Sequence, residues 1–240
     1  FLQRMSHDIR TPINGICGMI DVADHHADDL EKQTECRAKI KEASHLLLEL
    51  VNEVLDMSKL EADEMVLEET PFNLSSIAKE VFAVIEQMAA EQNIRIMWEK
   101  KEVTHRNFIG SPAYVKRVMM NILSNAVKYN KENGCIYVSC REIISEQPEM
   151  TTMEFVCRDT GIGMTDAFQK HIFEPFAQEH IGSRTKFTGT GLGMPISKKL
   201  VEKMGGTITF KSKEGEGTTF LIRVPFKIDL GADKREEQQD

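Results

Sequence analysis

Two long segments near the start of the chain carry apolar residues at the spacing of one helical face. The first runs from Leu2 to Ala23 and the second from Gln33 to Leu60, with apolar side chains recurring every three or four residues. The short acidic segment 24–31 separates them, so the pattern predicts an antiparallel helical hairpin. The apolar stripe is too wide for one partner helix. We therefore expect two copies to form a four-helix bundle, which makes the protein a homodimer.

The pattern changes after the hairpin. The period is lost over 61–71, and a mixture of helical and strand-like segments follows. Asn73 is a suitable N-cap for a helix to residue 90, with inward residues Ile77, Val81, Val84, Ile85 and Met88. Further helices are predicted at 111–130 and 193–204, and strands at 94–99, 135–144, 152–158, 207–212 and 218–224. The overall expectation is α+β: a hairpin at 1–62, a linker at 63–71, an α/β sandwich at 72–227 and a polar tail or linker at 228–240.

Composition narrows the function classes. The net charge of −8 argues against general nucleic-acid binding, because the chain has no excess of basic residues to neutralise phosphates. No apolar run is long enough for a membrane span, so we expect a cytoplasmic segment without membrane contact of its own. A membrane anchor elsewhere in a longer chain remains an open alternative. The five cysteines form no CxxC pair and indicate reduced thiols.

His7 lies on the side of the first helix opposite the apolar stripe. A lone histidine there is most often an ordinary surface residue. Its neighbours are particular, however: Asp8 follows directly, Thr11 lies one turn on, and Pro12 lacks the N–H that a straight helix needs, so we expect a bend at 8–12. His7 is therefore a candidate reactive imidazole, provided that the rest of the chain supplies a reactant.

Two segments of the sandwich suit a nucleotide. Asn121, Asn125 and Lys128 lie at helical steps on one face, where an amide oxygen suits Mg²⁺ and a lysine suits a phosphate; a plain polar helix face is the alternative. Asp159 follows a strand, and its carboxylate suits an exocyclic amine such as that of adenine. Gly161 and Gly163 would allow close approach of the backbone, although ordinary turns use the same residues.

Two further segments complete the predicted pocket. Phe173 and Phe176 begin a stretch of about seventeen residues with no apolar period, which we interpret as a lid anchored by these two rings. The next segment opens a helix, where free N–H groups and the helix dipole favour an anion. It consists of Gly189, Thr190, Gly191, Leu192 and Gly193. It matches neither a Walker loop nor a dinucleotide-binding loop.

Five motifs in this order resemble the catalytic core of a two-component sensor histidine kinase over residues 1–227. SHDIRTP resembles the H box, NILSNAVKY the N box, DTGIGM and GTGLGM the two glycine boxes, and IFEPF the F box. The sequences of these five motifs resemble most those of hybrid kinases, which carry a receiver domain in the same chain. The resemblance implies a dimeric phosphoacceptor hairpin and a Bergerat-type ATP-binding domain, as in gyrase, Hsp90 and MutL.

The resemblance also implies roles for individual residues. His7 would accept the phosphoryl group, Asn125 would hold Mg²⁺ with Asn121 assisting, and Lys128 would contact phosphate. Tyr129 would lie beside adenine, and Asp159 with Thr218 would bind its amine. The lid departs from the family pattern, which leaves its basic residue open between Arg184 and Lys186.

The implied reaction is transfer of the γ-phosphoryl group of Mg-ATP to Nε2 of His7, then to an aspartate of a response-regulator receiver domain. Asp8 would hold the Nδ1 proton of the imidazole. Thr11 has two interpretations: a residue that orients water for phosphatase activity toward the regulator, or a polar surface residue. Two rival functions are an ATP-driven conformational clamp and a pseudokinase. ATP-driven conformational clamps of the gyrase and Hsp90 kind have a glutamate one helical turn before the asparagine that binds the metal. This chain has Asn121 at that position.

Overall fold

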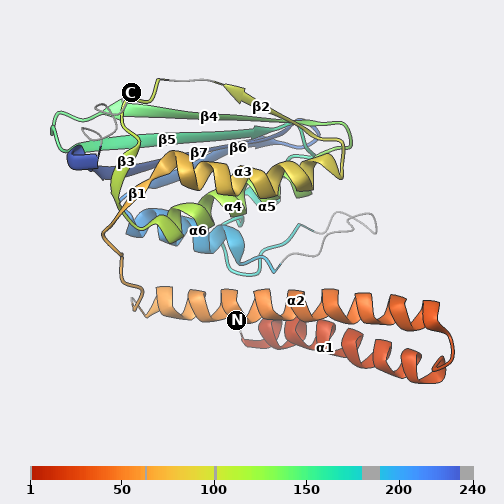
Figure 1. The fold of residues 1–240 in the computed structure, drawn as a ribbon. Helices are drawn as coiled ribbons and strands as arrows, with labels where there is room; N and C mark the ends of the chain where they lie inside the picture. The colour runs from red at the N-terminus through yellow and green to blue at the C-terminus, as the bar shows by residue number, and fades with distance from the viewer. Residues whose placement is uncertain (1, 63, 100–101, 180–189, 233–240) are drawn as a thin grey trace.

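The structure is a computed structural model that describes residues 2–62, 64–99, 102–179 and 190–232, with side chains from residue 9 onward. Two long antiparallel helices, α1 (Leu2–His25) and α2 (Leu30–Glu61), form the predicted hairpin (Figure 1). Helix α2 begins three residues earlier than predicted, because Asp29 caps it by accepting a hydrogen bond from the N–H of Lys32 at 3.0 Å. Pro12 lies inside α1, which is assigned as one continuous helix.

A mixed sheet with helices on one face follows the hairpin (Figure 1). The strands are β1 (Thr70–Asn73), β2 (Arg95–Glu99), β3 (Asn107–Gly110), β4 (Cys135–Ile144), β5 (Met150–Asp159), β6 (Thr207–Lys213) and β7 (Gly217–Ile228). The helices are α3 (Leu74–Ala90), α4 (Pro112–Lys128), the short α5 (Asp166–Gln169) and α6 (Gly193–Lys203). The strand order is β1-β3-β7-β5-β4-β2, with β6 paired to β7. Strands β2 and β4 are parallel, and the other described pairs are antiparallel.

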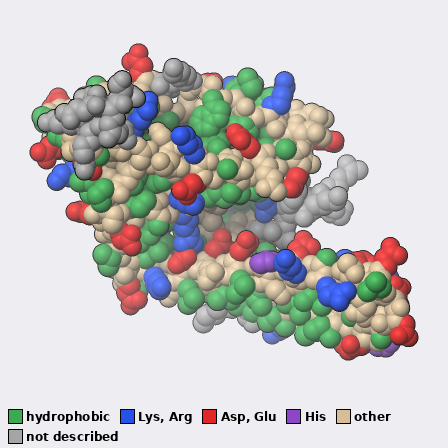
Figure 2. All heavy atoms as spheres, viewed as in Figure 1, with side chains coloured by type: hydrophobic (Ala, Val, Ile, Leu, Met, Phe, Trp, Pro, Cys, Tyr) green, Lys and Arg blue, Asp and Glu red, His purple; other side chains and the backbone are tan. Residues whose placement is uncertain are grey.

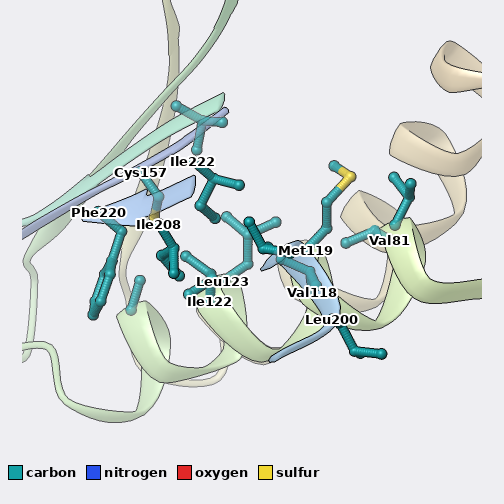
Figure 3. Packing of buried hydrophobic residues seen from close by; sticks show 14 of the residues in the cluster. Val81, Val118, Met119, Ile122, Leu123, Cys157, Leu200, Ile208, Phe220 and Ile222 are labelled. Atoms are coloured by element: carbon teal, nitrogen blue, oxygen red, sulfur yellow. The ribbon is translucent and has the colours of Figure 1, made fainter. Parts of the chain in front are cut away.

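The core lies between this sheet and the helices α3, α4 and α6. Figure 3 shows Val81 of α3 and Leu123 of α4 in the same cluster as Leu200 of α6 and Ile222 of β7. Val81 belongs to the inward face predicted for the helix after Asn73, and each of the other helices also contributes an apolar stripe to this cluster. Burial of one stripe per helix therefore explains the layering. The predicted α+β architecture, a hairpin followed by a sandwich, is confirmed.

Several local predictions differ from the structure. Val84 was expected in the core but is 46% exposed, because the buried stripe of α3 runs through Val81, Ile85 and the unpredicted Phe82. Strands β1 and β3 and helix α5 were not predicted. Each has only four residues, too few for a period to be recognised, and β1 begins within the segment expected to be a linker.

The second half of α2 is packed against the sandwich. Met57 is 1% exposed and belongs to the same apolar cluster as the core of the sandwich. Asp56 forms an ion pair with Arg117 of α4, and Figure 1 shows α2 running below α6. The hairpin therefore touches the sandwich through side chains as well as through the connecting segment.

Other faces of the hairpin, including that of the second half of α2, leave apolar side chains uncovered. Figure 2 shows hydrophobic side chains gathered along the hairpin, and the exposed ones include Ile13, Ile20, Leu48, Val51 and Leu55. An uncovered stripe of this kind is typical of a surface that binds another protein. Among the described helices, none combines the length and apolar character needed to cross a lipid bilayer.

Candidate active site

Helix α4 presents a row of polar side chains on the face opposite its buried stripe. The side-chain nitrogen of Asn125 donates to Oδ1 of Asn121 at 3.3 Å, and the side-chain nitrogen of Asn121 donates to Oγ of Ser197 in α6 at 2.8 Å. Ile122 and Leu123 on the other face are fully buried, which fixes the rotation of the helix. The two amides are thus held in place, and the oxygen of Asn125 is the atom that suits a cation.

Asp159, the last residue of β5, is a buried carboxylate that receives two backbone hydrogen bonds. Its Oδ1 accepts from the N–H of Gly161 at 2.8 Å and from the N–H of Thr218 at 3.2 Å. Burial raises the pKa of Asp159, and these hydrogen bonds oppose the rise. Oγ1 of Thr218 lies 2.8 Å from Oγ of Ser212, so Thr218 is positioned from both sides.

The first glycine segment is clamped between the end of α4 and the β6–β7 turn. The N–H of Ile162 donates to the carbonyl of Tyr129 at 3.0 Å, and a Cβ on Gly161 would lie 2.2 Å from the same oxygen. Gly163 has φ +65°, and a Cβ there would lie 2.0 Å from the carbonyl of Lys213. Glycine is therefore required at both positions, and the clamp brings the end of α4 beside Asp159.

Lys128 and Tyr129 end α4 at this clamp. Nζ of Lys128 lies 5.1 Å from the centre of the Tyr129 ring, which is 38% exposed and so available to a ligand. Burial lowers the pKa of Lys128, while the charges of Glu53 and Glu49 raise it. A partly desolvated lysine beside an accessible ring suits a phosphate next to an aromatic base.

The second glycine segment leads into α6. A Cβ on Gly193 would lie 2.3 Å from Oδ1 of Asn121, so this glycine lets α6 begin directly against the amide pair. The N–H of Leu192 donates to Oγ1 of Thr190 at 3.2 Å, and the carbonyl of Gly191, which has φ +71°, accepts from the N–H of Phe176 at 3.0 Å.

The rings predicted to anchor the lid are both held in the structure. Phe173 packs edge-on against Phe210 with ring centres 5.8 Å apart, and Nζ of Lys198 lies 5.1 Å from the Phe173 ring. Phe176 is buried and bound to Gly191, as described above. The segment 177–179 therefore leaves the sandwich next to the second glycine segment.

Some predicted site residues cannot be placed in this geometry. Lys186 and Gly189, like Arg184, lie outside the described residues. His7 and Asp8 lie on α1, but their side chains are outside the described part. Thr11 is exposed on the same helix.

The structure also assigns neighbours that sequence patterns did not indicate. Ser197 and Ser212 hold Asn121 and Thr218 through their hydroxyls. Glu53 of α2 contacts Thr190 by a side-chain hydrogen bond. None of these residues belongs to a recognisable motif, and only the folded arrangement shows that they touch the site.

Two known domain families match the chain. Residues 1–63 match the His Kinase A (phospho-acceptor) domain. Residues 110–228 match the histidine kinase-, DNA gyrase B- and HSP90-like ATPase family.

Individual proteins that are similar to this chain are also histidine kinases. The chain is 33% identical over 223 residues to the sensor histidine kinase GacS of Pseudomonas protegens, covering 92% of this chain and 24% of GacS. It is 33% identical over 228 residues to the signal transduction histidine-protein kinase BarA of Escherichia coli, covering 93% of this chain and 24% of BarA. The chain thus spans about a quarter of the length of these relatives.

Solved structures give the same result. Full-length ShkA in complex with AMPPNP superposes with a TM-score of 0.68 at 26% identity, over 95% of this chain and 46% of that one. Histidine kinase ThkA in complex with the response regulator protein TrrA superposes with a TM-score of 0.69 at 26% identity, over 93% of this chain and 60% of that one. The chain belongs to the sensor histidine kinases, with a phospho-acceptor hairpin followed by an ATPase domain of the gyrase and HSP90 class.

Proposed function

We propose that this chain is an autophosphorylating protein-histidine kinase that moves the γ-phosphoryl group of ATP to His7 and then to an aspartate of a receiver domain. The observation that carries the proposal is one connected network. The clamp at Tyr129 joins the amide pair of α4 to Asp159, and Gly193 joins the same pair to the second glycine segment. That network contains groups suited to binding an adenine base, a chain of phosphates and a cation.

The adenine end is assigned to Asp159. A carboxylate oriented by two backbone N–H groups would accept a hydrogen bond from the exocyclic amine, with Thr218 beside it and the Tyr129 ring against the base. The phosphate end is assigned to Lys128 and to the segment from Thr190 to Gly193 at the start of α6. Lys186 and Gly189 remain predictions for the lid side.

Asn125 is the proposed protein ligand of Mg²⁺, assisted by Asn121. Among the described residues no group of three or more histidine, cysteine, aspartate or glutamate side chains is arranged to hold a metal, so the cation would share its ligands with the nucleotide phosphates. When bound, Mg²⁺ would neutralise charge on the transferred phosphoryl group.

His7 is the proposed acceptor. Its Nε2 must be unprotonated to attack, and Asp8 would hold the proton on Nδ1 and support the positive charge that forms. The bond between the γ-phosphorus and its bridging oxygen breaks as the nitrogen–phosphorus bond forms, and ADP leaves. Thr11 is the proposed residue for a separate phosphatase reaction, in which it would orient a water that attacks the aspartyl phosphate of the regulator and releases inorganic phosphate.

The proposed partners follow from the hairpin. Its uncovered apolar side chains would be buried in a homodimer, and its exposed α1 surface would receive the receiver domain. ThkA, a structural neighbour, is described in complex with a response regulator protein, which supports this partner class.

An ATP-labelling assay with Asn125→Ala tests the proposal. Loss of the amide oxygen should remove most of the acid-labile label, while Gln87→Ala, which deletes an exposed amide on α3, should label like the unmodified protein. Equal labelling of Asn125→Ala and the unmodified chain would contradict the assignment.

A further inference from the structure

One apolar contact and two ion pairs hold the second half of α2 against the ATPase domain. Met57 is buried in the shared apolar cluster, Asp56 pairs with Arg117, and Nζ of Lys199 lies 3.8 Å from Oε1 of Glu61. Figure 1 shows α2 running beneath α6. Glu53, one turn before Met57, therefore faces the same domain.

Glu53 is an unusual residue for a helix surface. The side chain of Thr190 hydrogen-bonds to it, but its Oε2 is buried and has no hydrogen-bond partner among the described residues. Burial raises the pKa of Glu53. A buried carboxylate oxygen without a donor destabilises the docked arrangement, so its presence there calls for an explanation other than stability.

The groups that Glu53 faces are those proposed to hold phosphate. Thr190 belongs to the second glycine segment. Burial lowers the pKa of Lys128, and the negative charges of Glu53 and Glu49 oppose that lowering. Glu49, Glu53 and Asp56 are spaced by four and three residues, so they share one face of α2. A row of carboxylates thus lies on the face of α2 that contacts the ATPase domain.

We propose that Glu53, supported by Glu49, is an internal competitor for the phosphate groups of ATP. While α2 is docked on the ATPase domain, the Glu53 carboxylate accepts the hydrogen bond of Thr190 and interacts electrostatically with Lys128. ATP must therefore displace this carboxylate in order to bind. By linkage, ATP in turn weakens the docking of α2 on the domain. The inference rests on the proposed function, because it needs Lys128 and Thr190 to be phosphate ligands.

The test measures equilibrium binding of Mg-ATP and of adenosine to the full chain by calorimetry. Glu53→Gln removes the charge and should tighten ATP binding by about tenfold, within the usual range of coupling between sites. Adenosine, which has no phosphate, should bind both proteins equally. Glu53→Asp keeps the charge and should bind ATP more weakly than Glu53→Gln.

Two further variants separate this role from others. Glu42→Gln removes an exposed carboxylate from the same helix, away from the ATPase domain, and should leave both affinities unchanged. Asp56→Asn loosens the docking without touching Thr190 or Lys128, so it should also tighten ATP binding. It provides the test if Glu53→Gln does not fold.

The possible results are distinct. Equal or weaker ATP binding by both Glu53→Gln and Asp56→Asn, with adenosine binding intact, would overturn the competitor role and leave the proposed function standing. If neither ATP nor adenosine binds any of the proteins, the proposed function fails together with the inference.

Discussion

Oδ1 of Asp159 accepts a hydrogen bond from the N–H of Thr218, 59 residues further along the chain, at 3.2 Å. The same oxygen accepts from the N–H of Gly161, so two separate segments orient one carboxylate. Two backbone hydrogen bonds thus fix the orientation of this carboxylate, and a preorganised group loses less conformational freedom when it binds a ligand.

Replacing that carboxylate should damage nucleotide binding more than folding. In Asp159→Asn the amide nitrogen would face either a backbone N–H or the adenine amine, and both are donors. We expect ATP affinity to fall by about tenfold to a hundredfold, the range for losing a hydrogen bond to a charged group. Calorimetric titration checks this, with the exposed Asp166→Asn as control. An unchanged affinity would remove Asp159 from the adenine site.

The raised pKa of Asp159 predicts a pH dependence of binding. Burial makes this carboxyl take up a proton at a higher pH than an ordinary aspartate, which titrates near 3.9. Since the charged form is the better acceptor, affinity is fully present above the folded-state pKa and falls as pH drops through it. Adenosine is the probe, because it has no titrating phosphate. Asp159→Asn should flatten the profile, and an equally steep profile in that variant would assign the dependence to another group.

Gly163 should tolerate no side chain. Gly163→Ala introduces both a strained φ of +65° and a Cβ 2.0 Å from the carbonyl of Lys213. Gly215→Ala has a similar φ of +79° but open space around the Cβ, so it isolates the strain, about 1–2 kcal/mol. Chemical denaturation should show a larger loss of unfolding free energy for Gly163→Ala. Equal losses would show that the clamp relaxes without cost.

The cysteines should differ sharply in reactivity. Cys17 is exposed on α1, whereas Cys36 and Cys157 are buried. Burial, with a smaller contribution from Glu142, raises the pKa of Cys140 to about 11, so little thiolate is present near neutral pH. Brief alkylation of the native protein followed by peptide mass spectrometry should find Cys17 modified first. Rapid modification of Cys157 would contradict the packing of β5.

Much of this fold follows from local rules. Asn73 caps α3 as its residue type indicates, accepting from the N–H of Ser76 at 3.0 Å. The helix predicted at 111–130 forms as α4, and its apolar stripe, which includes Ile122 and Leu123, is buried. These predictions succeed because the capping residue determines where a helix begins and its apolar stripe determines which face is buried, and both can be read from the local sequence.

Other features depend on partners distant in the chain. Strand β3 has four residues, and it is a strand because β1 and β7 pair with it on either side. Val84 has the same character as its buried neighbours, and only the position of the sheet decides that it stays outside. Glu53 has the spacing of a solvated helix face. Its Oε2 is buried only because α2 packs against the ATPase domain, and no local sequence pattern indicates that contact.

Incubation of the chain with γ-labelled Mg-ATP is the decisive test of the proposed phosphoryl transfer to His7. We expect an acid-labile, base-stable label on the peptide that contains His7, and no label in His7→Gln although that variant still binds ATP. Label at an unchanged level in His7→Gln, or no label in the unmodified protein under conditions in which ATP is bound, would contradict it.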